Sequence, residues 1–112
     1  MKRENRVRKH SDFNRIIQQG QTLKGHRFSI HYERSGEDET HIGIAVGKRN
    51  GGAVARVKIK RQIRSIVAEC WKDYRIPLNI VILVRANYST SEFAESKEEL
   101  GKLLTTIKDE KH

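Results

Sequence analysis

An amphipathic segment near the middle of the chain constrains the fold more than any other feature. In AVARVKIKRQIRSIV, residues 53–67, and the few residues after it, apolar side chains recur with the period of an α-helix. At about 100° per residue, one side of this helix carries Ala55, Ile59, Ile63, Ile66, Val67 and Cys70. A stripe of this width packs on a β-sheet, so we expect a helix that ends near Trp71 and covers one face of a sheet.

Two segments before this helix alternate as β-strands do. In RFSIHYER, residues 27–34, the aromatic and aliphatic side chains point to one face, and HIGIAVG, residues 41–47, repeats the alternation. After His41, the opposite face of the second segment carries Gly43, Ala45 and Gly47, and these small residues leave room for something to approach closely. SGEDET, residues 35–40, has the composition of a turn, so the three segments together predict a β-hairpin.

A short helix precedes the strands. Phe13, Ile16 and Ile17 fall at positions i, i+3 and i+4 of a helical pattern. Ser11 can cap its N-terminus, and Gly20 supplies a C-terminal stop. We therefore expect a helix that lies between these two residues.

Two further segments complete the order of elements. IPLNIVILVR, residues 76–85, is a short apolar run typical of a buried strand, and STSE, residues 89–92, fits a capping box. Apolar residues at helical spacing then indicate a closing helix: Phe93, Leu100, Leu104 and Ile107. The order helix, hairpin, helix, strand, helix predicts one α+β domain over residues 1–112, with helices laid on a small sheet.

The charge balance points to a polyanionic partner. Twenty-three lysines and arginines stand against fourteen acids, which gives a formal net charge of +9 and a pI of about 10.0. Nucleic acid is the first candidate and an anionic membrane the second. The first ten residues form a basic, flexible arm able to settle on phosphates, and a solvated tail is an equal alternative.

The sequence shows no signal that directs the chain out of the cytoplasm. The N-terminus lacks the apolar stretch of a signal peptide, and the longest apolar run, residues 80–84, is too short to span a bilayer. The single cysteine, Cys70, excludes an intramolecular disulfide. The simplest expectation is a soluble, cytoplasmic protein.

The amphipathic helix also has a cationic side. No acid occurs in residues 40–68, whereas a merely solvated helix face would mix acids with its lysines and arginines. Like charges at helical spacing repel by roughly 0.2–0.5 kcal/mol per pair, so the cations on this side of the helix do not stabilise the fold. We interpret it as a phosphate-binding surface that extends into the glycine-rich loop before the helix. Its residues are Lys48, Arg49, Arg56, Lys58, Lys60, Arg61 and Arg64.

The sequence does not indicate a metal site or a catalytic centre in the protein itself. The five histidines are scattered and the lone cysteine lies on the apolar stripe, so no metal site is predicted. No serine or cysteine stands in the local pattern of an activated nucleophile, and GKRNGGAV lacks the ending of a phosphate-binding P-loop. We interpret the chain as a binding protein without catalytic residues or a cofactor of its own.

Four stretches of the chain match one known family. They are RENRVRKHSDFNRIIQQG, the strands RFSIHYER and HIGIAVGKRNGGAV, and the helix ARVKIKRQIRSIV. Together they resemble the protein subunit of bacterial ribonuclease P over nearly the whole chain. The family's signature helix begins Arg-Asn-Arg, where this chain has Arg56, Val57 and Lys58. The resemblance implies a two-layer α/β sandwich shared with a ribosomal-protein domain, with one small mixed sheet and a left-handed crossover around the signature helix.

The resemblance also implies a role in tRNA processing. In that family a catalytic RNA with bound Mg2+ removes the 5′ leader from precursor tRNA, and the protein assists as a subunit of this endoribonuclease. The basic helix and loop would dock on ribonuclease P RNA, and a cleft between the first helix and the sheet would hold the single-stranded leader. Phe13, Ile17 and Tyr32 match positions of that cleft, where flat rings stack on bases. From the pattern alone, a core position is the more natural interpretation of Phe13 and Tyr32.

Three other functions fit parts of the sequence. A ribosomal or chaperone-like protein would bind structured RNA with the same charge pattern and without preference for a 5′ leader. A DNA-binding helix-turn-helix protein is less favoured, because KRNGG follows a strand pattern rather than a first helix. A stand-alone nuclease would cleave RNA with no RNA subunit present. We expect no membrane partner and no obligate protein partner.

Overall fold

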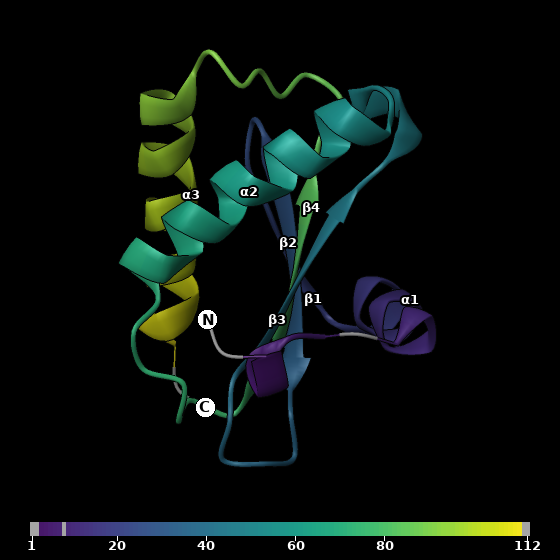
Figure 1. Ribbon diagram of the computed structural model, residues 1–112. Coiled ribbons are helices and arrows are strands. Elements are labelled where there is room, and N and C mark those ends of the chain that lie inside the picture. Colours follow the sequence, from purple (N-terminus) through teal and green to yellow (C-terminus); the bar gives the residue numbers. More distant parts are fainter. Residues whose placement is uncertain (1–2, 8, 111–112) are drawn as a thin grey trace.

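A four-stranded mixed sheet lies at the centre of the structure, a computed structural model that describes residues 3–7 and 9–110. The strands are β1 (Gln21–Lys24), β2 (Phe28–Arg34), β3 (His41–Val46) and β4 (Leu78–Val84), in the spatial order β1-β2-β4-β3. The helices are α1 (His10–Gln19), α2 (Ala53–Cys70) and α3 (Phe93–Lys108), with short 3-10 turns η1 (Arg3–Asn5) and η2 (Lys48–Asn50). Figure 1 shows α2 and α3 on one side of the sheet and α1 on the other. The predicted α+β class is confirmed.

β4 occupies the middle of the sheet, between β2 and β3. It pairs with β2 in the antiparallel sense and with β3 in the parallel sense. The predicted hairpin between residues 27–34 and 41–47 is therefore wrong. The reason is that β4 is apolar toward both faces: Ile80, Val81 and Ile82 are all fully buried. Such a strand gains most from a position that other elements cover on both faces.

β1 is a strand that the sequence patterns did not predict. It pairs with β2 as an antiparallel hairpin, so the hairpin of this fold lies before β2 rather than after it. Only Leu23 of its four residues is even partly buried. A strand this short and this exposed carries no alternation that a sequence pattern could detect.

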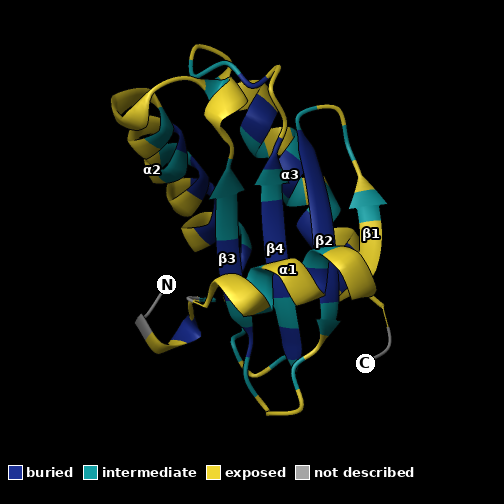
Figure 2. Cartoon of the chain, turned by 90° about the vertical axis from the view of Figure 1, so that its right-hand side faces the viewer, coloured by how far each residue is buried: buried dark blue, intermediate teal, exposed yellow. Residues whose placement is uncertain are grey.

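The connection from β3 through α2 to β4 is a parallel βαβ crossover. In Figure 2 the arrows of β3 and β4 both point up, β4 lies to the right of β3, and α2 lies behind the sheet. Seen from the side of α2, the chain therefore moves to the left. The expected left-handed crossover is confirmed, against the right-handed rule that nearly all such connections follow.

The main core lies between the sheet and the helices α2 and α3. The predicted stripe of α2 is buried in its middle part: Ile59, Ile63, Ile66 and Val67. Its first residue, Ala55, is exposed, and Cys70 is half-buried. α3 adds Leu100, Leu104 and Ile107 as predicted. Within the described ranges, no helix combines the length and the apolar composition needed to cross a membrane.

The two predicted side-chain caps are absent. α1 begins at His10 with Lys9 at the capping position, so Ser11 lies inside the first turn and makes no capping bond. The capping position of α3 is Glu92, also without a side-chain cap. Ser89, the predicted cap, lies three residues before Glu92, and its Oγ is 2.7 Å from Ser91 Oγ. The predicted stop at Gly20 is confirmed by its N–H, which donates to the Ile16 carbonyl at 2.9 Å.

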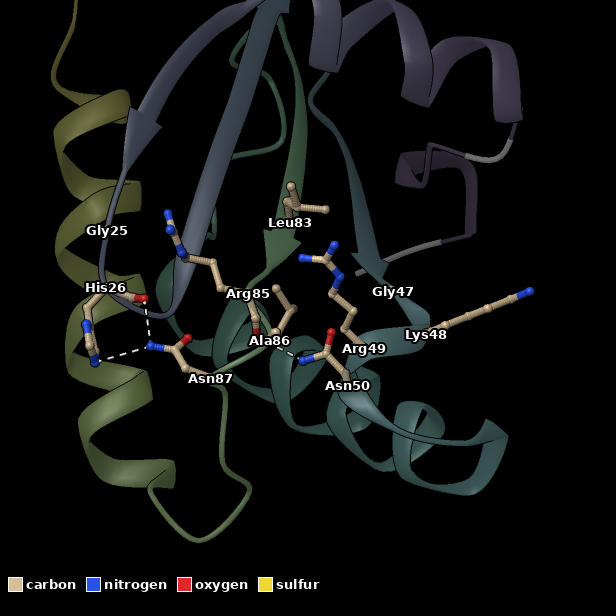
Figure 3. A pocket seen from close by; sticks show the side chains of 11 residues that line it. Gly25, His26, Gly47, Lys48, Arg49, Asn50, Leu83, Arg85, Ala86 and Asn87 are labelled. Atoms are coloured by element: carbon tan, nitrogen blue, oxygen red, sulfur yellow. Dashed lines mark hydrogen bonds between the residues drawn. The ribbon is translucent and has the colours of Figure 1, made fainter.

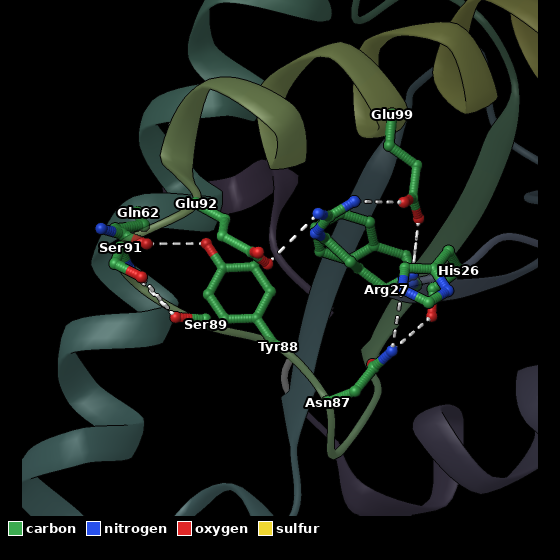
Figure 4. A network of polar contacts seen from close by, with 10 residues as sticks. His26, Arg27, Gln62, Asn87, Tyr88, Ser89, Ser91, Glu92 and Glu99 are labelled. Carbon is green, nitrogen blue, oxygen red and sulfur yellow. Dashed lines mark hydrogen bonds and ion pairs between the residues drawn. The ribbon is translucent and has the colours of Figure 1, made fainter.

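One carboxylate fastens α3 to the start of β2. Figure 4 shows Glu99 reaching from α3 to the segment before β2. Its Oε2 accepts hydrogen bonds from the backbone N–H groups of Arg27 at 2.8 Å and Phe28 at 3.2 Å, and its Oε1 accepts one from the Arg27 guanidinium at 3.2 Å. Nearby, the Tyr88 hydroxyl donates to Gln62 of α2 at 2.7 Å. These contacts set the position of α3 against the sheet and α2.

We expect Glu99→Ala to lower the free energy of unfolding by about 2 kcal/mol, because two backbone N–H groups and a guanidinium lose their shared acceptor. Urea denaturation measures the change. Glu98→Ala is the matched control, since Glu98 is 70% exposed and pairs with Lys102 on the same helix. Equal losses in the two variants would contradict this role of Glu99.

Candidate nucleic-acid interface

α1 packs across the face of the sheet opposite α2 and α3, as Figure 2 shows. Ile16 is fully buried there, while Phe13 and Ile17 are half-buried. The Phe13 ring lies directly on Gly43 of β3: a Cβ added to this glycine would lie 2.6 Å from the ring's ζ carbon. The small face predicted for β3 is therefore what allows an aromatic ring of α1 to lie against the sheet.

The N-terminal segment docks along the free edge of β3. Arg6 forms an isolated parallel bridge with Ile42, and the N–H of Val7 donates to the Ile42 carbonyl at 3.2 Å. The Asn5 amide, only 5% exposed, donates to the Thr40 carbonyl at 2.9 Å. The arm predicted over residues 1–10 is thus attached to the sheet at residues 5–7, while residues 1, 2 and 8 lie outside the described residues.

A small hollow of about 170 Å³ joins these parts to the basic helix. It is lined by Arg6, Val7, Phe13, Ile42, Gly43, Ile44, Lys60 and Arg64. Lys60 and Arg64 belong to the row that α2 turns toward β3. The structure therefore brings two cations assigned to the catalytic RNA beside Phe13, which was assigned to the leader cleft. The two predicted surfaces meet at this hollow.

Tyr32 lies on the wrong face of the sheet for the predicted cleft. It is 5% exposed, belongs to the core under α2 and α3, and donates its hydroxyl hydrogen to Glu110 at 2.7 Å. Burial first, and the bond to Glu110 second, raise the pKa of Tyr32 to about 12. The prediction that Tyr32 contributes to the cleft is wrong, because α1 covers the face of β2 that carries Glu33, which pairs with Arg15 of α1.

His31 is the flat ring that β2 turns toward the α1 side. Its Nδ1 lies 3.1 Å from the Thr22 hydroxyl and its Nε2 lies 3.2 Å from the Ser29 hydroxyl, so both ring nitrogens have partners. Burial first, and the charge of Lys24 second, lower the pKa of His31. The sequence analysis missed this residue because β2 carries rings on both faces, and alternation alone does not say which face α1 covers.

The seven predicted cations form no ion pair with any residue that the structure describes. Arg56 and Lys60 are half-buried, and the other five are exposed. Among the described residues, no acid lies within 4.0 Å of any of the seven, whereas Lys97 and Lys102 of α3 each pair with a glutamate. The first turn of α2 has no acid and no side-chain cap, so its amides and the helix dipole add to the positive potential. The surface is arranged to receive anions.

A larger hollow of about 860 Å³ opens where β3 and β4 end, and Figure 3 shows it from close by. Lys48 and Arg49 come from η2, Arg85 follows β4, and His26 comes from the turn between β1 and β2. The Asn50 amide donates to the Arg85 carbonyl at 2.8 Å and so fixes η2 to the end of β4. No acid lines this hollow. Arg85 was missed, since a single arginine after a strand shows no pattern until parallel pairing brings it to the same hollow as Arg49.

One group in the described part of the chain could hold a cation: Glu37, Glu39 and His41, whose ligand atoms lie within 4.8 Å of one another. His41 Nε2 is 3.3 Å from Glu39 and 3.8 Å from Glu37, which are ion-pair distances for a protonated ring. The fold thus places His41, one of the scattered histidines, beside two glutamates of the preceding loop. The two glutamates are 67% and 46% exposed, and nothing further marks this loop as a metal site.

The fold and these surfaces define a small basic RNA-binding protein. A family model described as Ribonuclease P matches residues 1–108, and the chain belongs to the ribonuclease P protein family. Membership makes it the protein subunit of an endoribonuclease holoenzyme that processes tRNA, in partnership with ribonuclease P RNA and a tRNA substrate. The alternative of a ribosomal or chaperone-like protein is not favoured.

Relatives and solved structures agree over nearly the whole chain. The ribonuclease P protein component of Mycoplasma mycoides is 35% identical over 109 residues, covering 96% of this chain and 100% of the relative. That of Bacillus pumilus is 31% identical over 104 residues, covering 92% and 87%. The structure of the Thermotoga maritima RNase P protein matches with a TM-score of 0.79 at 28% identity over 90% and 96% of the two chains. That of Staphylococcus aureus matches at 0.77, with 26% identity over 93% and 95%.

The contact between Arg15 and Glu33, which ties α1 to β2, should depend on pH. Glu33 accepts hydrogen bonds from Arg15 at 2.8 Å and Asn79 at 2.9 Å, and the bond from Arg15 is the main reason that the pKa of Glu33 is lowered. Because the pKa of Glu33 is lowered in the folded state, the ionised carboxylate stabilises the fold at pH values above its ordinary pKa of 4.5. This stabilisation is lost as the pH falls through the lowered pKa of the folded state.

We therefore expect Glu33→Gln to lower the free energy of unfolding by about 1 kcal/mol at pH 7, a value reduced because Arg15 is 42% exposed. The difference from the unmodified chain should shrink below pH 4.5. Denaturant titrations at pH 7 and pH 3 measure it. Asp38→Asn, at an exposed carboxylate that forms no ion pair with any described residue, is the control. A loss of the same size at both pH values would show that shape rather than charge matters at Glu33.

Proposed function

We propose that this chain assists removal of the 5′ leader of precursor tRNA by holding ribonuclease P RNA on the cationic surface of α2 and η2, and the leader on the α1 face of the sheet. The observation that carries this proposal is the hollow in which Phe13 lies beside Lys60 and Arg64. A ring that can stack on a base next to cations that can neutralise phosphates suits a single strand. The residues that contact the catalytic RNA are Lys48, Arg49, Arg56, Lys58, Lys60, Arg61 and Arg64.

We assign the hydrolysis itself to the RNA subunit and its magnesium ions. The protein side chains neutralise phosphates and position the strand, which changes binding and orientation rather than supplying a nucleophile. In this proposal the protein holds no cofactor of its own. Purified chain that cleaved precursor tRNA without any RNA subunit would contradict the assignment.

In this proposal the leader runs between two hollows on this side of the sheet. Gly43 lies under Phe13, and Gly47, four residues further along β3, lines the hollow that holds Lys48 and Arg85. At about 3.3 Å per residue the two hollows are roughly 13 Å apart, a span of a few nucleotides. Phe13, Ile17 and His31 line the start of this path in the proposal, and Arg85 lines its end.

The salt dependence of RNA binding tests the cationic surface. Replacing Lys60, Arg61 and Arg64 together by alanine should weaken binding of ribonuclease P RNA and flatten the dependence of log affinity on log salt by about 0.7 to 0.9 per lost phosphate contact. Filter binding over a salt series measures both quantities. Lys102→Ala, which removes an exposed cation paired with Glu98 on α3, is the control. An unchanged slope in the triple variant would remove this surface from the RNA contact.

Binding of precursor and mature tRNA tests the leader contact. In the holoenzyme, Phe13→Ala should weaken binding of precursor tRNA about tenfold and leave mature tRNA unaffected, because only the precursor has bases to stack on the ring. Tyr32→Phe is the control on the opposite face: it removes the bond to Glu110 and should not discriminate between the two substrates. Equal losses for both substrates in Phe13→Ala would point to a structural role of the ring.

A further inference from the structure

Two valines on α2 are exposed without a structural reason. Val54 is 86% exposed and Val57 is 57% exposed, and they are the large apolar side chains that the described ranges leave open to solvent. Three residues apart on a helix, they are neighbours on its surface. β-Branched residues are also weaker helix formers than alanine, lysine or glutamate. The helix would be at least as stable with alanine at both positions.

The valines lie on the side of α2 opposite its buried stripe. At about 100° per residue, Val54, Val57, Lys58 and Arg61 fall within one arc, whereas Ile59 and Ile63 point to the other side. We call these four residues the outer ridge. It differs from the row of Arg56, Lys60 and Arg64, which lies between the outer ridge and β3. The outer ridge therefore does not line the hollow that holds Phe13.

We propose that the outer ridge docks on ribonuclease P RNA with Val54 and Val57 at its centre, packed against ribose and base faces while Lys58 and Arg61 contact the flanking phosphates. The proposal rests on the proposed function and adds a contact that charge alone does not provide. Apolar burial contributes in proportion to the area removed from water, and salt does not screen it as it screens phosphate contacts.

The positive charge around the outer ridge favours a polyanion, rather than another protein, as the binding partner. No acid occurs in residues 40–68, and Lys58 and Arg61 have no acidic partner among the described residues. A second copy of this chain would bring the same cations to the same place, and each copy carries a net charge of +9. RNA neutralises these cations and also offers the partly apolar surfaces of its sugars and bases.

A salt series can measure separately the two parts of the affinity that the proposal distinguishes. One is the apolar contact of the valines, and the other is the phosphate contact of the cations. The double variant Val54→Ala with Val57→Ala should weaken binding of ribonuclease P RNA about tenfold at every salt concentration, because it removes buried methyl groups, and should leave the salt slope unchanged. Lys58→Ala, on the same ridge, is the matched variant: it should flatten the slope by about 0.7 to 0.9, and its loss of affinity should shrink as salt rises.

Failure to fold does not complicate this test. Both valines make no core contact that would be lost, and alanine favours the helix. Thermal melting of the free variants should match the unmodified chain. The Val57→Thr variant keeps the shape of the side chain and replaces one methyl group by a hydroxyl, so it should lose part of the same salt-independent affinity.

The proposal is overturned if the double variant binds ribonuclease P RNA as tightly as the unmodified chain. It is also overturned if sedimentation shows that the valines hold two copies of the free protein together while RNA affinity does not depend on them. Both results leave the proposed function intact, provided that the triple variant at Lys60, Arg61 and Arg64 still lowers RNA affinity. An unmodified chain with no affinity for this RNA would overturn the proposed function together with the inference.

Discussion

The central position of β4 is the constraint on which the rest of the structure depends. Its side chains are buried toward both faces of the sheet, so β2 and β3 flank it and helices cover both sides. Parallel pairing with β3 requires a crossover connection, and α2 is that connection. The basic row of α2 consequently runs beside β3. The same pairing brings the ends of β3 and β4 to one edge, where Lys48, Arg49 and Arg85 surround one hollow.

α2 and α3 lie on the same face of the sheet, but their charged residues differ in whether they have ion-pair partners. In α3, Glu99 holds the start of β2, and Lys97 and Lys102 are paired with glutamates of α2 and α3. In α2 the cations have no acidic partner among the described residues. Unpaired like charges at helical spacing cost stability in the free protein, and that cost is offset only when a polyanion binds and releases its counterions. α3 thus contributes mainly to stability and α2 also to binding.

The α1 face depends on small residues and on pairing at an edge. Gly43 allows the Phe13 ring to lie against the sheet, and the segment from Asn5 to Val7 covers part of the free edge of β3. An uncovered edge would be open to unwanted strand pairing. The result is one hollow built from three segments that lie far apart in the sequence: the N-terminal segment with α1, β3 and α2.

The amino-acid sequence by itself determined the main helices, three of the four strands and the cationic side of α2, because periods of 3.6 and 2 residues are local properties of the chain. It also carried the family resemblance that the matching relatives bear out. Only the tertiary structure decided that β4 rather than β3 pairs with β2, that His31 and not Tyr32 faces α1, and that Arg49 and Arg85 line one hollow. Strand pairing and helix placement depend on burial shared between distant segments, and a shift of one residue along a strand exchanges its two faces.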